Sequence, residues 1–167
     1  LSGATDANIT VALDTSGTGT EGTDYTDGSG NIDNITISAG ATTGTVLFTP
    51  TDDSTYEGNE TATISINGVT GKTGVAENST PQAVTITITD NESAPSVTLT
   101  TSANSIAENA GSSLTLTATI GNATYEDITV SIDGTGGTGT EGTDFATVSD
   151  ITISAGATTG TTSFTPT

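Results

Sequence analysis

The sequence contains no cysteine and no histidine, and Lys72 is the single basic residue among 167. Disulfides, zinc and iron–sulfur sites, and nucleophilic sites of the Ser-His or Cys-His type are therefore excluded. One lysine cannot form a binding surface for nucleic acid or anionic membranes, because both require clustered Lys and Arg. No run of 18 apolar residues is present, so we expect no membrane-spanning helix and no direct membrane insertion. The absence of cysteine and histidine, with only one basic residue, excludes most enzyme classes, and we expect no catalytic activity.

Nearly all of the charged residues are acidic. Asp and Glu number 20, the net charge is −19, and hydrophobic residues make up only 31% of the chain. Low hydrophobicity with high net charge is typical of disordered chains. However, the 21 glycines and 4 prolines stay below the roughly 25–30% share of unstructured low-complexity segments. Composition therefore leaves order and disorder open, and the residue pattern has to decide.

Apolar residues alternate with threonine or serine in many short runs. Such alternation predicts strands with Ile, Val or Leu on one face and Thr or Ser on the other. Glycine-rich turns separate the runs, no segment shows a helical period, and we predict an all-β chain of antiparallel sandwiches. The threonine faces are either solvated sheet surface or an adhesive array. The runs lie at 9–13, 35–37, 46–48, 62–66, 84–88, 97–99, 114–120 and 128–132.

The chain repeats itself. Residues 17–24 recur letter for letter at 137–144, and residues 35–45 recur at 151–161. The two offsets, 120 and 116, define a repeat of about that length with an insertion after Asp24. A boundary falls at 93–95, where Pro95 follows a run ending in acids. We therefore predict one repeat at 1–92, a linker at 93–95 and a second repeat at 96–167.

Neither repeat is complete by this alignment. The first lacks the counterpart of the strands between Ser96 and Ile120, and the second lacks the counterpart of residues 52–90. We expect the natural polypeptide to continue with further copies. The other explanation is that a neighbouring subunit donates the absent strands.

Carboxylates gather at the ends of the predicted strands and in loops. In the first repeat these acids include Asp24, the pair Asp52-Asp53, Glu57 with Glu60, and Asp90. If the strands before Asp52 and Asp90 run the same way, their carboxylates converge at one tip of the sandwich. Clustered carboxylates repel one another unless a cation lies among them. Oxygen-only ligands on flexible loops favour Ca²⁺ over transition metals.

Several motifs resemble the Calx-beta domain. The resemblance covers nearly the whole chain as two incomplete copies, and it implies immunoglobulin-like seven-stranded sandwiches. Calx-beta domains occur in sodium–calcium exchangers, an integrin and large microbial surface proteins, and some bind Ca²⁺ where one domain meets the next. The matching segments are Ile106-Ala-Glu-Asn-Ala-Gly111, Gly22-Thr-Asp-Tyr25, Gly142-Thr-Asp-Phe145, Asp52 to Thr61 and Val84 to Asp90.

The resemblance implies a set of calcium ligands. They are Asp24, Asp52, Asp53, Glu57 and Asp90 in the first repeat, and Glu108 and Asp144 in the second. The alternative for all of them is solvated loop charge. Asn91 departs from the family's closing acidic run, and neither repeat carries the full set. Glu21 and Glu141 stand where the family usually has a small residue, as exposed loop charge or as further ligands. A glycosidase pair of Asp52 with Glu57 is disfavoured, because the chain has no tryptophan.

Together these features predict a structural repeat module of an extracellular or cell-surface fibre or adhesin, stiffened by Ca²⁺ at domain tips and junctions. Its expected partners are adjacent repeats of the same chain and neighbouring copies in a fibre. One alternative is a calcium-sensing regulatory module, which should change shape on binding the ion. Another alternative is a module that binds carbohydrate or another ligand. The low aromatic content of 4% disfavours this alternative.

Overall fold

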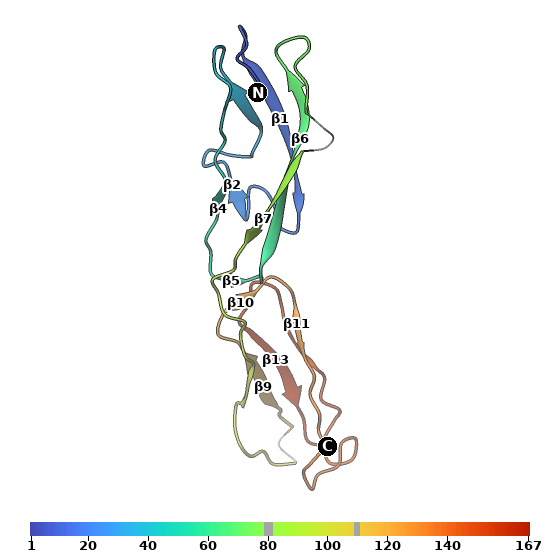
Figure 1. The fold of residues 1–167 in the computed structure, drawn as a ribbon. Coiled ribbons are helices and arrows are strands. Elements are labelled where there is room, and N and C mark those ends of the chain that lie inside the picture. Colours follow the sequence, from blue (N-terminus) through green and yellow to red (C-terminus); the bar gives the residue numbers. More distant parts are fainter. Residues whose placement is uncertain (79–81, 109–110) are drawn as a thin grey trace. The chain divides into compact units, whose positions relative to one another are not determined.

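The computed structural model describes residues 1–78, 82–108 and 111–167 (Figure 1). Every regular element in these residues is a strand, which confirms the all-β prediction. Accordingly, this part of the chain has no helix long and apolar enough to cross a membrane. The contacts divide the chain into two compact units. Unit 1 consists of residues 1–53 and 59–90, and unit 2 consists of residues 54–58 and 91–167.

Unit 1 is built on a four-stranded antiparallel sheet with the order β3-β1-β6-β7. A second, short antiparallel pair joins β2 to β4. The register of β1 on β6 shifts between Ala12 and Leu13, which marks a β-bulge. The strands are β1 (Ile9–Gly17), β2 (Tyr25–Thr26), β3 (Asn34–Ile37), β4 (Thr49–Pro50), β6 (Glu60–Thr70) and β7 (Ala83–Ile88).

The alternation seen in the sequence places apolar side chains in the core of unit 1. Tyr25, Ile32 and Ala62 are buried there. The ring of Phe48 stacks on Tyr25 with centroids 4.9 Å apart and planes inclined by 23°. This aromatic pair joins the short β2–β4 layer to the main sheet, because Ala62 lies on β6 within the same cluster. The packing of two β layers is that of a sandwich.

Unit 2 contains a three-stranded antiparallel sheet, β13-β9-β8, and an antiparallel pair, β11-β12. Its core contains Ala118, Ile120, Ile151 and Ile153. A parallel pair of β5 with β10 is the exception to the antiparallel rule. The strands are β5 (Thr55–Tyr56), β8 (Thr98–Thr101), β9 (Leu114–Thr119), β10 (Ala123–Thr124), β11 (Ile128–Val130), β12 (Ile151–Ile153) and β13 (Thr159–Phe164).

One predicted strand is not formed. The alternation of Val46 with Phe48 favours a strand, yet residues 43–48 belong to no ladder. Their counterpart in the second repeat is β13, which pairs with β9. A strand needs a neighbour as well as a suitable sequence. A segment that differs at only two of six positions finds one in unit 2, whereas residues 43–48 find none in the described residues of unit 1.

Candidate metal centre

The repeated loop at residues 17–24 is fixed to the start of β6. Gly17 has φ 133°, and a Cβ there would lie 2.1 Å from the Thr61 carbonyl oxygen, so only glycine fits. Gly19 N–H donates to the same carbonyl oxygen at 3.0 Å. In return, Thr61 N–H donates to Thr18 Oγ1 at 2.9 Å. These bonds hold the loop beside Glu60, the first residue of β6.

A tight turn then orients Asp24. Its Oδ2 accepts a hydrogen bond from Thr20 N–H at 2.5 Å, and its own N–H donates to the Thr20 carbonyl oxygen at 2.8 Å. Gly22 closes the turn at φ 85° and donates to the Tyr25 carbonyl oxygen at 2.9 Å. The sequence Thr-Glu-Gly-Thr-Asp thereby presents a half-buried carboxylate at a defined place.

The carboxylates of Asp24 and Glu60 approach each other. One oxygen of each lies within 4.8 Å of the other, and both side chains are half-buried. Because Ca²⁺ binds oxygen at about 2.3–2.6 Å, two ligands of one ion are separated by up to about 5 Å. The single basic side chain of the protein, Lys72, forms an ion pair with Asp6. The acidic pair could therefore hold a metal ion.

Three further predicted ligands belong to unit 1. Asp52 and Asp53 follow β4 and are exposed. Their neighbour Thr51 donates its N–H to the Asp24 carbonyl oxygen at 2.8 Å, which places the chain before Asp52 beside Asp24. Asp90 is half-buried and comes two residues after Ile88. Since Ile88 pairs with Glu60, Asp90 follows at the same end of the sheet.

The remaining predicted ligands belong to unit 2. Glu57 follows β5 in the segment 54–58, which groups with unit 2. Glu108 is exposed in the connection between β8 and β9. Asp144 repeats the turn of Asp24, since its Oδ2 accepts from Thr140 N–H at 2.7 Å. Among the described residues, neither Glu108 nor Asp144 is gathered with two other acidic side chains.

Glu21 and Glu141 have a role that the sequence did not reveal. Glu21 Oε1 accepts from Ile32 N–H at 2.5 Å, and Oε2 accepts from Thr15 Oγ1 at 3.0 Å. In the second repeat, Glu141 Oε1 accepts from Val148 N–H at 3.0 Å. Each glutamate thus ties its loop to the chain that follows. This is neither of the two interpretations drawn from the sequence.

Glu60 is the residue that the predicted ligand set omits. The sequence shows it among the loop acids, but its place at the start of a long apolar strand concealed its role. The register of β6 with β1, in which Ala62 faces Gly17, brings Glu60 to the Asp24 loop. Only the cross-strand pairing supplies this signal.

The carboxyl of Asp27 has a lowered pKa. Hydrogen bonds from Ser29 N–H, Ser29 Oγ–H and Gly30 N–H lower the pKa of its carboxyl below the usual 3.8. The N–H and hydroxyl groups favour the charged form by donating to it. Asp27 closes an exposed turn and lies outside the acidic pair.

Comparison with known proteins identifies the family. The model of the Calx-beta domain matches residues 1–92 and 90–162. The comparisons with curated proteins and with solved structures found no match. The two family matches together cover nearly the whole chain, and both copies carry the β architecture described above. The chain therefore belongs to the Calx-beta family, of which it contains two domains in tandem.

Proposed function

We propose that the chain is a structural repeat module of an extracellular or cell-surface fibre or adhesin, and that Ca²⁺ stiffens it at its acidic loops. The observation that carries the proposal is the approach of Asp24 and Glu60 to within 4.8 Å. The association of Calx-beta domains with calcium and with extracellular proteins supports it. The repetition supports the structural role, because both copies build the same loop with the same bonds at Asp24 and Asp144.

Asp24 and Glu60 would hold the ion, and Asp52, Asp53 and Asp90 are further candidate ligands at the same end of unit 1. Glu57 stands three residues before Glu60 in the sequence and is a further candidate. A bound Ca²⁺ supplies positive charge to carboxylates that otherwise repel one another. In the second domain, the candidates are Asp144, which is the counterpart of Asp24, and Glu108.

The energetic consequence follows from the charge. A chain of net charge −19 resists compaction by self-repulsion. An ion that binds only the folded state stabilises it by RT ln(1 + [L]/Kd), about 2.7 kcal/mol at a hundredfold excess over Kd. Calcium would therefore raise the melting temperature and reduce loop motion without any catalytic step. The proposed module is not an enzyme, and its partners are other repeats.

Thermal unfolding tests the calcium proposal directly. The 167-residue chain is melted in millimolar CaCl₂ and in EDTA at matched ionic strength, with circular dichroism as the readout. We expect a melting temperature several degrees higher with calcium. A magnesium arm separates a specific site from general screening, because Mg²⁺ demands a smaller, octahedral shell. Equal melting in all three buffers would contradict the proposal.

A further inference from the structure

The β-bulge in unit 1 contains the dipeptide Asn67-Gly68. Leu13 and Ala12 are consecutive on β1, but they pair with Ile66 and Gly68, which are not consecutive on β6. Asn67 is therefore the extra residue of the bulge and has no partner on β1. An Asn-Gly sequence is typical of a turn, yet here it lies within a strand of 11 residues.

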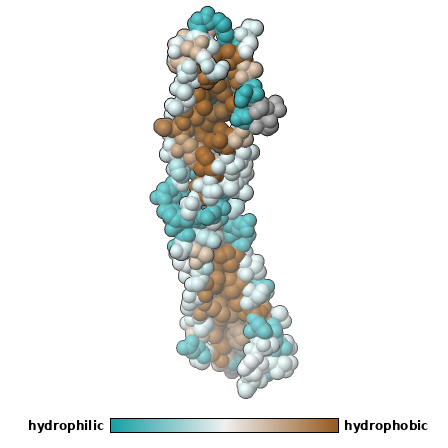
Figure 2. All heavy atoms as spheres, in the orientation of Figure 1, coloured by the Kyte–Doolittle hydropathy of each residue, from teal (hydrophilic) through white to brown (hydrophobic). Residues whose placement is uncertain are grey.

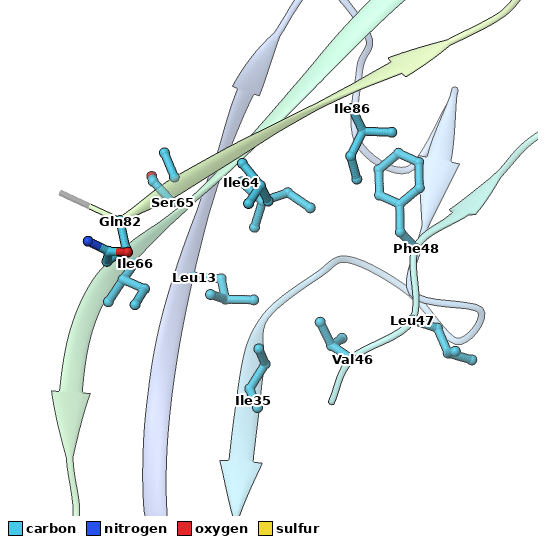
Figure 3. A pocket seen from close by; sticks show the side chains of 12 residues that line it. Leu13, Ile35, Val46, Leu47, Phe48, Ile64, Ser65, Ile66, Gln82 and Ile86 are labelled. Carbon is cyan, nitrogen blue, oxygen red and sulfur yellow. The ribbon is translucent and has the colours of Figure 1, made fainter. Parts of the chain in front are cut away.

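The bulge keeps the apolar side chains of β6 on one face. Leu13 and Ile66, the pair before the bulge, line the same apolar pocket of unit 1 (Figure 3). Apolar side chains also form a broad patch over unit 1 in Figure 2. Beyond the bulge, Val69 pairs with Val11. Two residues between Ile66 and Val69, instead of one, return Val69 to the apolar face, and the extra residue is a polar one.

Asn67 is also held weakly by the rest of unit 1. The ladder between β6 and β7 ends two residues before it. Its side chain is exposed and forms no hydrogen bond within the part of the chain that the structure describes. Other asparagine side chains are fixed, since Asn8 Oδ1 accepts from Ala39 N–H at 2.9 Å and Asn59 Oδ1 accepts from Asp90 N–H at 3.1 Å.

Gly68 leaves the main-chain nitrogen after Asn67 accessible. It has no side chain, and no described atom lies within 4 Å of the place that a Cβ would occupy. A regular strand gives a different neighbour, because an exposed residue is followed by one that faces the core. Asn34 on β3 is exposed and is followed by Ile35, whose β-branched side chain crowds the nitrogen.

We propose that Asn67 is a site of spontaneous self-modification, where asparagine is converted through a cyclic imide to aspartate and isoaspartate. The Gly68 nitrogen attacks Asn67 Cγ and forms the ring bond. The side-chain nitrogen leaves as ammonia and carries away the proton of the Gly68 amide. Water then cleaves the imide, at the bond from Cγ to nitrogen to give aspartate or at the main-chain bond to give isoaspartate. One water is consumed and one ammonia is released.

The bulge makes this reaction possible in the folded chain. Ring closure requires the backbone of Asn67 to rotate away from the extended conformation of a strand. A residue that is paired on both sides can rotate only when its ladders open, and the free energy of opening slows the reaction. Asn67 has neither ladder. The reaction uses neither calcium nor its candidate ligands, so it is independent of the proposed function.

Ageing of the purified 167-residue chain at pH 8 in EDTA tests the site. Peptide mass mapping locates the loss of asparagine, and enzymatic methylation measures isoaspartate. We expect Asn67 to react at least about tenfold faster than Asn104, which is exposed but precedes Ser105. Asn34 should stay unchanged. The rate at Asn67 should rise with hydroxide concentration, because the amide nitrogen attacks as its anion.

A synthetic peptide of residues 62–72 gives the rate without the fold. We expect Asn67 in the folded chain to react within about tenfold of the peptide, since no ladder has to open. A regular strand position would lag far behind its peptide. This comparison separates the effect of the bulge from that of the Asn-Gly sequence.

Gly68→Ala is the decisive variant. Gly68 does not have a positive φ, and space is open around it, so alanine should fit without changing the melting temperature. Its methyl group crowds the attacking nitrogen and should slow the reaction at Asn67 at least about tenfold. Gly121→Ala is the matched control, with equal space around the added Cβ, and should leave the rate unchanged. If Gly68→Ala unfolds unit 1, the peptide with the same substitution supplies the comparison.

Several results would overturn the proposal. One is a rate at Asn67 no higher than at Asn104. Another is a rate more than about tenfold below that of the peptide, which would show that the bulge protects Asn67 as a regular strand does. An unchanged rate in Gly68→Ala would also contradict it. Because calcium is absent throughout, none of these results bears on the calcium proposal.

Discussion

The carboxylate of Glu21 accepts a hydrogen bond from the backbone N–H of Ile32, 11 residues later, at 2.5 Å. Ile32 is 3% exposed, so this amide lies at the edge of the core of unit 1. The second carboxylate oxygen accepts from Thr15 Oγ1 at the end of β1. One side chain therefore connects the repeated loop to the strand before it and to the core segment after it.

Glu21→Ala should destabilise unit 1. Removing the acceptor leaves the Ile32 amide without this bond, which costs about 1–3 kcal/mol. Urea unfolding in EDTA measures the change. Asp14→Ala is the matched control, since it removes the same charge from an exposed position of β1, and it should change the free energy of unfolding by less than about 0.5 kcal/mol. Equal effects of the two substitutions would show that charge, rather than the hydrogen bond, sets the stability.

Asp27 should make stability depend on acidic pH. Its pKa in the folded chain lies below 3.8 because Ser29 and Gly30 donate to the carboxylate. A lowered folded pKa contributes stability that is present above the unfolded pKa and is lost as the pH falls through the folded pKa. The difference in unfolding free energy between the natural chain and Asp27→Ala should therefore shrink between about pH 4 and pH 2.

Ser29, which donates hydrogen bonds to the Asp27 carboxylate, supplies the control. Ser29→Ala removes the hydroxyl donor but keeps both backbone donors, so it should move the pKa of Asp27 part of the way back towards 3.8. A ¹³C NMR titration of the Asp27 carboxyl in each protein measures both values. A midpoint at or above 3.8 in the natural chain would contradict this assignment.

Much of the fold follows from local pattern. The alternation at 9–13, 62–66, 84–88 and 114–120 predicts strands that the structure contains as β1, β6, β7 and β9. The short β5 gave no such signal, because two residues are too few to show a period. Its parallel pairing with β10 joins residues that lie 68 positions apart, Thr55 and Ala123. Such pairing is fixed by tertiary contacts and cannot be deduced from either segment alone.

The acidic pair of Asp24 and Glu60 was likewise only partly predictable from the sequence. Asp24 was predicted because its loop carries a family motif, but Glu60 was not included. Its importance comes from the register of β6 on β1 and from the close fit of Gly17 against Thr61. Sequence reasoning indicates which residues can bind calcium, and strand pairing decides which of them meet.

Removing either member of the pair should remove most of the calcium effect on melting. Asp24→Asn and Glu60→Gln keep the size of each side chain and delete its charge, which hard cations such as Ca²⁺ need. The measurement is the difference in melting temperature between calcium and EDTA. Asp90→Ala, at the same end of unit 1, should reduce this difference as well.

Glu77→Gln is the control for this series. Glu77 accepts a hydrogen bond from the Gln82 amide, in the connection between β6 and β7 and outside the predicted ligand set. The Glu77→Gln substitution removes one negative charge, as the other variants do. It should leave the calcium-dependent difference in melting temperature intact. If Glu60→Gln behaved like this control, the acidic pair would not be the calcium site.

Hydrogen exchange should distinguish the two copies of the repeated segment in the protein alone. β13 pairs with β9, whereas residues 43–48 belong to no ladder. We expect exchange averaged over 159–164 to be at least about tenfold slower than over 43–48. Because the two sequences differ at only two positions, 46 and 47, intrinsic exchange rates nearly cancel. Equal protection would mean that 43–48 already has a partner strand.

Gly160→Ala should destabilise unit 2 through a direct steric conflict. A Cβ at this position would lie 2.3 Å from the Thr152 carbonyl oxygen and 2.8 Å from Ile151 Cγ2. Both atoms belong to β12, whose Ile151 is fully buried, so neither can move without disturbing the core. Overpacking of this kind costs about 1–3 kcal/mol. Thermal unfolding, followed at the amide of Ile151, measures the loss.

Gly121→Ala is the matched control, because a Cβ there meets nothing within 4 Å. It should leave unit 2 nearly unchanged. Gly44→Ala tests the equivalence of the two segments, since its Cβ would lie 2.3 Å from the Thr36 carbonyl oxygen. If residues 43–48 are held against β3 as firmly as β13 is held against β12, Gly44→Ala should destabilise unit 1 by a similar amount. A tolerated Gly44→Ala beside a damaging Gly160→Ala would mean that the segment needs its partner strand before it takes the β13 position.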